Sequence, residues 1–173
     1  MAVQSLRQTM ERARTDPASA VVQVELEGNW NLDPAQPQFS STLPTPQAGP
    51  VELKADFPPP LGGQGRAPSA VQYCLYAATA CFLSTFALVA ALEGVSLRRL
   101  SVRASARMNL SRLLDAGPAP VVEQLKWTVQ ADTDADDATL KRLLQLAEER
   151  CPAAWCLRNP VPFETEVARA GQA

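Results

Sequence analysis

The sequence predicts an α+β fold built around one long helix. Two regions, residues 22–57 and 99–131, contain runs that alternate apolar and polar side chains, as half-buried strands do. Between them, residues 67–92 form a stretch without a charged side chain. The length of 173 residues and the 46% hydrophobic content suit one domain with an apolar core.

The N-terminal half is predicted to hold a short helix and a three-stranded meander. Residues 1–16 place apolar side chains on one helical face, and Pro17 follows. Strands are expected at residues 22–26, 38–45 and 51–57, because these runs are separated by loops rich in Asn, Asp, Gly and Pro. Short strands joined by such turns indicate antiparallel pairing.

The uncharged stretch is predicted to be a buried central helix rather than a membrane span. Ser69 precedes Gln72 by three residues, which is the pattern of a capping box, and Gly94 closes the other end. Residues 70–92 are long enough to cross a bilayer. However, seven of these 23 residues are alanine, and the strands on both sides have polar outer faces. We therefore expect a helix enclosed by sheets and other helices, and no membrane partner.

The C-terminal half is predicted to form a β-hairpin, a second helix and a final strand. Residues 99–106 and 124–131 alternate on either side of a Gly-Pro turn. An acidic run then opens a helix whose apolar face ends with Cys151, just before Pro152. Residues 161–166 make a last short strand.

This pattern divides the chain into three parts. An N-terminal helical extension covers residues 1–19, a single domain covers residues 20–167, and a tail covers residues 168–173.

Composition excludes several classes of function. A net charge of −2 does not indicate the basic surface that binds nucleic acid. The absence of histidine excludes a Ser-His-Asp triad, a Cys-His pair and a His-containing zinc site. The cysteines lack zinc-ligand spacing, and no phosphate-binding glycine loop is present, so we expect no metal and no cofactor. The cysteines are Cys74, Cys81, Cys151 and Cys156.

The N-terminus lacks the apolar core of a signal peptide. We therefore expect a cytoplasmic location, where thiols stay reduced unless they do redox work.

Two motifs resemble the family of osmotically inducible protein C (OsmC) and the organic hydroperoxide resistance proteins. They are "LGGQGRAPSAVQYCLYAATACF" at residues 61–82 and "AEERCPAAWCL" at residues 147–157. Both show the family pattern: a Gly-Gly loop before an Ala-rich helix with a central cysteine, and a Cys-Pro at the end of the next helix. The resemblance covers residues 20–167. It implies an intertwined homodimer, in which two sheets enclose the central helices and the thiols lie at the subunit interface.

The resemblance also implies a chemistry. In the family's peroxidases one cysteine attacks a hydroperoxide and becomes a sulfenic acid, and a second cysteine forms a disulfide with it. By this resemblance Cys81 attacks and Cys151 resolves. The substrate would be a small apolar hydroperoxide, and an unidentified thiol would reduce the disulfide. The alternative is a non-catalytic protein of the same fold that binds a small apolar ligand.

The sequence departs from the family pattern at the activating groups. The peroxidases use an Arg from the N-terminal hairpin and a carboxylate about ten residues before the attacking cysteine, and both are missing here in their usual places. Arg66 and Gln72, near the helix start, are the auxiliary candidates, and Arg66 would have to act across the dimer. Gln72 is otherwise a helix cap. Cys74 and Cys156 are expected to pack as small hydrophobic residues, with Cys156 an alternative resolving thiol.

Overall fold

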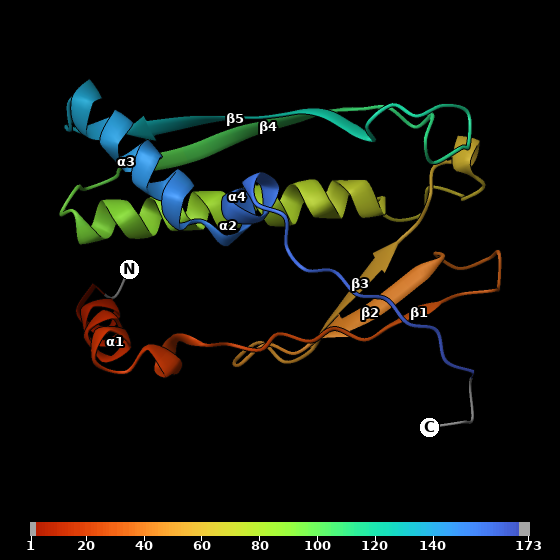
Figure 1. The fold of residues 1–173 in the computed structure, drawn as a ribbon, viewed down its shortest axis with the longest axis horizontal. Helices are drawn as coiled ribbons and strands as arrows, with labels where there is room; N and C mark the ends of the chain where they lie inside the picture. The colour runs from red at the N-terminus through yellow and green to blue at the C-terminus, as the bar shows by residue number, and fades with distance from the viewer. Residues whose placement is uncertain (1–2, 170–173) are drawn as a thin grey trace.

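The computed structural model describes residues 3–169 as two separate sheets and a long helix, α2 (Figure 1). The predicted α+β class is confirmed. Residues 1–2 and 170–173 lie outside the described part, so the ends of the predicted extension and tail are not described. The elements in chain order are α1 (Val3–Thr15), η1 (Pro17–Ala20), β1 (Gly28–Trp30), β2 (Phe39–Leu43), β3 (Val51–Ala55), η2 (Pro59–Leu61), α2 (Ala70–Leu92), β4 (Arg99–Met108), β5 (Val122–Asp132), α3 (Asp137–Arg150) and α4 (Pro152–Arg158).

Helix α2 begins and ends where the sequence predicts. The side chain of Ser69 accepts a hydrogen bond from the backbone N–H of Gln72, and the backbone N–H of Ser69 donates to Gln72 Oε1 at 2.8 Å. This reciprocal pair satisfies two N–H groups that a helix start would otherwise leave unpaired. At the other end Gly94 adopts a left-handed φ of 74°, which terminates the helix.

The core lies along the C-terminal half of α2, which packs against β4, β5, α3 and α4. Phe82 of α2 stacks on Trp127 of β5 with ring centroids 4.6 Å apart. The indole N–H of Trp127 also donates to Thr79 Oγ1 at 3.0 Å, so the middle of α2 is fixed to the hairpin. The fully buried cluster comprises Phe82, Phe86, Val89, Ala90, Leu143, Ala147, Cys151 and Ala154.

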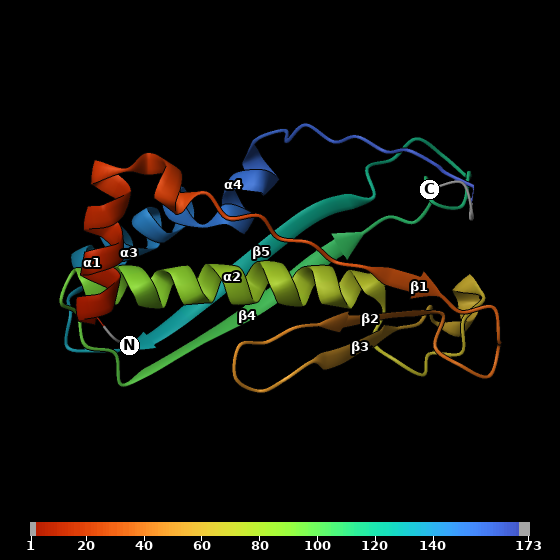
Figure 2. The same ribbon diagram turned by 90° about the horizontal axis from the view of Figure 1, so that it is seen from below.

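Only part of α2 is enclosed, which differs from the expectation of a helix covered on all sides. Tyr76 is 71% exposed, and the three-stranded sheet projects away from the helix instead of covering it (Figures 1 and 2). Among the described residues, α2 is the one helix whose length and mean hydropathy of 1.9 would suffice to cross a membrane. Core helices of soluble proteins meet the same criteria, so this feature is weak evidence for a span.

The predicted meander is present, with a correction to its first strand. β1, β2 and β3 pair antiparallel in that order, and β2 and β3 lie at the predicted positions. Residues 22–26, predicted as the first strand, are extended and exposed, and β1 is the short run after them. Alternation predicts extended backbone, but a strand also needs a hydrogen-bonding neighbour. This segment finds none within the described chain.

The C-terminal half contains the predicted hairpin and second helix. β4 and β5 pair antiparallel, and Asp136 caps α3 by accepting a hydrogen bond from the N–H of Thr139 at 2.8 Å. Two predictions are corrected here. The chain continues helically after Pro152 as α4, and the predicted final strand at residues 161–166 is unpaired, with Phe163 87% exposed.

Replacing Phe82 by alanine tests this packing. Phe82 is 2% exposed, so Phe82→Ala should lower the free energy of unfolding by about 3–5 kcal/mol, measured by urea denaturation. The matched control is Leu114→Ala, in the loop between β4 and β5, which should change stability by less than about 0.5 kcal/mol because its side chain is 59% exposed. Equal effects of the two substitutions would contradict the described core.

Candidate active site

Two thiols that lie 70 residues apart in sequence meet at one point of the structure. Cys151 Sγ lies 3.6 Å from Cys81 Sγ. Cys151 is fully buried and Cys81 is partly buried, and both are free thiols. A disulfide bond is about 2.05 Å long, so a small side-chain movement would join the two sulfur atoms.

The position of Cys151 follows from the proline after it. A residue before proline is disfavoured in helical geometry, and Cys151 is accordingly extended, with φ −75° and ψ 120°. It ends α3, where its N–H donates to the carbonyl of Ala147 at 2.9 Å. It also caps α4, because its Sγ accepts from the N–H of Ala154 at 3.5 Å. The break between the two helices therefore directs this sulfur at α2.

The surroundings of Cys81 keep its thiol protonated. Burial is the largest cause that raises the pKa of Cys81 above its usual value, and the neighbouring Cys151 and Cys156 raise it further. The backbone N–H of Ala153 acts in the opposite direction. No cation is among the main causes. Since the thiolate is the nucleophile, a raised pKa leaves less of Cys81 in its reactive form at neutral pH.

The two auxiliary candidates are engaged elsewhere within the protomer. The guanidinium of Arg66 donates to the carbonyl oxygens of Pro34 and Ala35, in the loop between β1 and β2. Gln72 is held in the cap of α2. Arg66 is thus fixed on the N-terminal hairpin, the region from which the resemblance expects an activating Arg.

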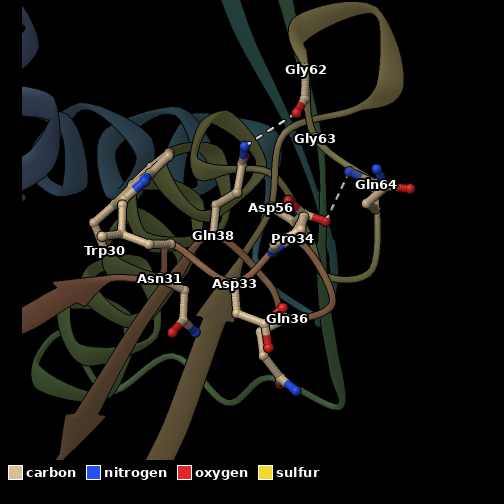
Figure 3. Close-up of a pocket in the computed structure, with 11 residues that line it drawn as sticks. Trp30, Asn31, Asp33, Pro34, Gln36, Gln38, Asp56, Gly62, Gly63 and Gln64 are labelled. Carbon is tan, nitrogen blue, oxygen red and sulfur yellow. Dashed lines mark hydrogen bonds between the residues drawn. The ribbon is translucent and has the colours of Figure 1, made fainter.

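Asp56 holds the loop that carries Arg66, although no sequence motif marks it as a functional residue. Its side chain is almost fully buried, and Oδ2 accepts from the backbone N–H of Gln64 at 3.2 Å (Figure 3). The same oxygen accepts from the backbone N–H of Arg66 at 2.9 Å. The bond from Arg66 is the largest cause that lowers the pKa of Asp56. The signal available in the sequence was the position of this acidic residue, shortly before the Gly-Gly loop.

The Gly-Gly pair lets this loop close. Gly62 has a left-handed φ of 83°, and a Cβ on Gly63 would lie 1.9 Å from the carbonyl oxygen of Phe57. Gln38 of the hairpin donates to the carbonyl of Gly62 at 3.3 Å (Figure 3). The loop and hairpin enclose a hollow of about 200 Å³ that no cysteine lines, so it is separate from the thiol pair.

The two remaining cysteines differ from expectation. Cys74 and Cys156 are both exposed rather than packed. Cys74 lies on the N-terminal half of α2, where no residue of the helix is fully buried.

Two sheets, a central helix with one thiol, and a Cys-Pro helix break with the second thiol define a class of two-cysteine α+β proteins. Within that class the chain belongs to the OsmC-like family, whose family model matches residues 63–166. The resemblance stated from the two motifs is thereby confirmed. Comparison with curated proteins finds no match.

Solved structures share the fold. An OsmC-like protein from Mycoplasma pneumoniae aligns with a TM-score of 0.60 and 15% identity, covering 80% of this chain and 89% of that one. An organic hydroperoxide resistance protein OsmC from Legionella pneumophila aligns with a TM-score of 0.54 and 21% identity, covering 80% of this chain and 92% of that one. A Vibrio cholerae protein with captopril bound in one of its active sites aligns with a TM-score of 0.55 and 20% identity, covering 82% of this chain and 89% of that one.

Protonation of Asp56 should weaken the loop. The hydrogen bonds that the Asp56 carboxylate accepts lower its pKa in the folded state. The carboxylate therefore stabilises the folded protein fully at any pH above the ordinary carboxyl pKa. That effect is lost as the pH falls through the lowered value. Asp56→Asn should therefore reduce the melting temperature most at neutral pH, and the difference from the wild type should shrink in acid. A pH-independent difference for Asp56→Asn would contradict this role.

Proposed function

We propose that this protein reduces small organic hydroperoxides with Cys81 as the attacking thiol and Cys151 as the resolving thiol. The observation that carries the proposal is the 3.6 Å distance between the two sulfur atoms. Membership of the OsmC-like family supports it, and so do the names of similar structures, among them an organic hydroperoxide resistance protein.

The proposed reaction transfers two electrons from the thiols to the peroxide. The Cys81 thiolate attacks one peroxide oxygen, the O–O bond breaks, and the alkoxide takes up a proton to leave as an alcohol. The thiolate of Cys151 then attacks the sulfenic sulfur, hydroxide leaves as water, and the disulfide forms. A thiol reductant returns both cysteines to the reduced state. A cytoplasmic location would supply such thiols.

The surface beside the thiol pair suits an apolar substrate. A hollow of about 570 Å³ opens between β5, α3 and α4. No cysteine lines it, but Ala154, whose N–H donates to Cys151 Sγ, does. Its lining combines apolar side chains such as Phe82 and Trp127 with the charged side chains of Glu123, Lys126, Glu148 and Arg158. An alkyl or aromatic group would lose water-exposed apolar area on entering, which favours organic hydroperoxides over hydrogen peroxide.

A second copy of the chain is the proposed partner. The protomer exposes 13345 Å², whereas a compact protein of this mass exposes about 8,200 Å². The bare side of α2 forms a nearly apolar hollow of about 390 Å³ with β4, lined by Leu75, Tyr76 and Leu83. The unpaired segments at residues 21–27 and 161–167 carry exposed Val, Leu and Phe side chains. An intertwined homodimer would cover these surfaces.

The homodimer would also supply the missing cation. Arg66 is fixed at the loop between β1 and β2, on the sheet that projects from the protomer. We propose that this sheet covers the partner's central helix and brings Arg66 to the partner's Cys81. A nearby guanidinium would lower the pKa of that thiol and stabilise its thiolate.

The raised pKa of Cys81 favours a second candidate function. If no cation reaches the thiol, the protein would be a non-catalytic OsmC fold that binds a small apolar ligand in the hollow beside Cys81 and Cys151.

A thiol count separates the two functions. Reduced protein mixed with a slight excess of cumene hydroperoxide should lose two thiols, fall in mass by about 2 Da and release cumyl alcohol. Cys81→Ser should abolish all three changes, and Cys74→Ser should leave them intact. Unchanged thiols in the wild type would favour the non-catalytic binding protein.

Arg66 can be tested by the pH dependence of the same reaction. Arg66→Ala should slow the oxidation of Cys81 at neutral pH and shift the rise of the rate to higher pH, because the thiolate loses its cation. Arg66→Lys should restore part of the rate. Lys54→Ala removes an exposed cation from β3 of the same sheet and is the matched control. Identical pH profiles for Arg66→Ala and wild type would contradict activation by Arg66.

A further inference from the structure

We propose that the reduced pair of Cys81 and Cys151 is a chelating site for trivalent arsenicals that carry one organic group. The observation that carries this inference is the distance of 3.6 Å between the two sulfur atoms, taken as the spacing of two ligands. Chelation needs only that both thiols are free and adjacent. The inference therefore goes beyond the proposed peroxidase reaction and does not depend on it.

The sulfur spacing matches two bonds to one small central atom. A bond from a cysteine sulfur to a thiophilic atom is about 2.3 Å long, as it is for zinc. Trivalent arsenic is pyramidal, and two such bonds at an angle of about 100° hold their sulfur atoms about 3.5 Å apart. The pair lies at 3.6 Å, whereas a disulfide requires the sulfur atoms to approach to about 2.05 Å. Chelation therefore needs the smaller movement.

The number of available ligands disfavours the metal ions that cysteines usually bind. Zinc is almost always held by four ligands, and residues 3–169 contain no group of three or more His, Cys, Asp or Glu side chains that could hold a metal ion. Two thiolates on opposite sides of one soft metal ion would lie about 4.6 Å apart, farther than this pair. An arsenical with one organic group has two remaining bonds, which match the two thiols.

The proposed exchange starts from protonated thiols and needs no oxidant. When phenylarsine oxide binds, two As–S bonds replace the bonding of arsenic to oxygen. The oxygen takes up both thiol protons and leaves as water. Arsenic stays trivalent, and both sulfur atoms keep their oxidation state. Burial raises the pKa of Cys81 and keeps its thiol protonated, which is the form that this exchange consumes.

The other two cysteines provide an internal comparison. In residues 3–169 the contact between Cys81 and Cys151 is the one hydrogen-bonding contact between two cysteine sulfur atoms. Cys74 and Cys156 are exposed free thiols, and each would bind arsenic through a single bond. The second bond within the pair is intramolecular, and such linkage raises apparent affinity by about 10²–10⁴-fold.

Apolar surface lies beside the pair for the organic group. The hollow of about 570 Å³ includes Ala154, whose N–H donates to Cys151 Sγ, and the stacked rings of Phe82 and Trp127. An aryl group loses water-exposed apolar area against such side chains. A phenyl arsenical is therefore the suitable probe.

Two double variants with equal numbers of thiols test the proposal. Cys74→Ser/Cys156→Ser keeps the pair, and Cys81→Ser/Cys156→Ser keeps Cys74 and Cys151. Each is treated with phenylarsine oxide and then with excess 2-mercaptoethanol, a competing monothiol. In native mass spectrometry the first variant should stay heavier by about 150 Da, because both thiols hold the phenylarsenic group. The second should return to its original mass, because a single As–S bond exchanges with the monothiol.

The wild-type chain should behave like the first variant and should release the arsenical to 2,3-dimercaptopropanol, a competing dithiol. Circular dichroism spectra that match the wild type would show that both variants are folded. Loss of the arsenical to 2-mercaptoethanol from the wild type, or equal retention by the two double variants, would overturn the proposal.

A second arm separates this proposal from the peroxidase proposal. The first double variant is mixed with cumene hydroperoxide instead of the arsenical, and its mass should fall by about 2 Da if the pair is a peroxidase. If the variant retains the arsenical but does not react with the hydroperoxide, the peroxidase proposal fails while the chelating site stands. If the hydroperoxide oxidises the pair but no arsenical is retained, the chelating site is overturned while the peroxidase proposal stands.

Discussion

The packing of the α3–α4 break against α2 is the constraint on which the site depends. Pro152 forces Cys151 out of helical geometry, and the buried side chains around Phe82 fix how closely that break approaches α2. The distance of 3.6 Å between the two sulfur atoms follows from this packing. A continuous helix through residue 152 would carry Cys151 in another direction, so one proline links the fold to the chemistry.

The same packing has an electrostatic consequence. Burial brings the sulfur atoms together, but it also raises the pKa of Cys81 and keeps the thiol protonated. A hydroperoxide-reducing thiol needs the opposite shift, and the main groups acting on Cys81 include no cation. The paired thiols of the protomer therefore have no cation among the main groups that act on Cys81, and under the proposed function the homodimer would have to supply one.

Most of the local structure could be predicted from the sequence, because it depends on local rules. The capping box marks the start of α2, and alternation locates the hairpin strands. The paired motifs predicted that Cys81 and Cys151 lie close together, as the structure places them. Predictions failed where a distant neighbour decides the outcome. Residues 22–26 and 161–166 have strand-like patterns but no pairing partner within the described chain. The helix after Pro152 has a local signal, because proline is common at the first position of a helix as well as after the end of one.

The most direct test of the account is to locate the sulfur atoms in crystals by long-wavelength anomalous diffraction, before and after a cumene hydroperoxide soak. The reduced protein should show Cys81 and Cys151 sulfur peaks near the distance of 3.6 Å. After the soak they should approach to about 2 Å, the length of a disulfide bond. Sulfur peaks that lie far apart in the reduced crystal, or that do not move together after oxidation, would contradict the claim that these two thiols form one redox pair.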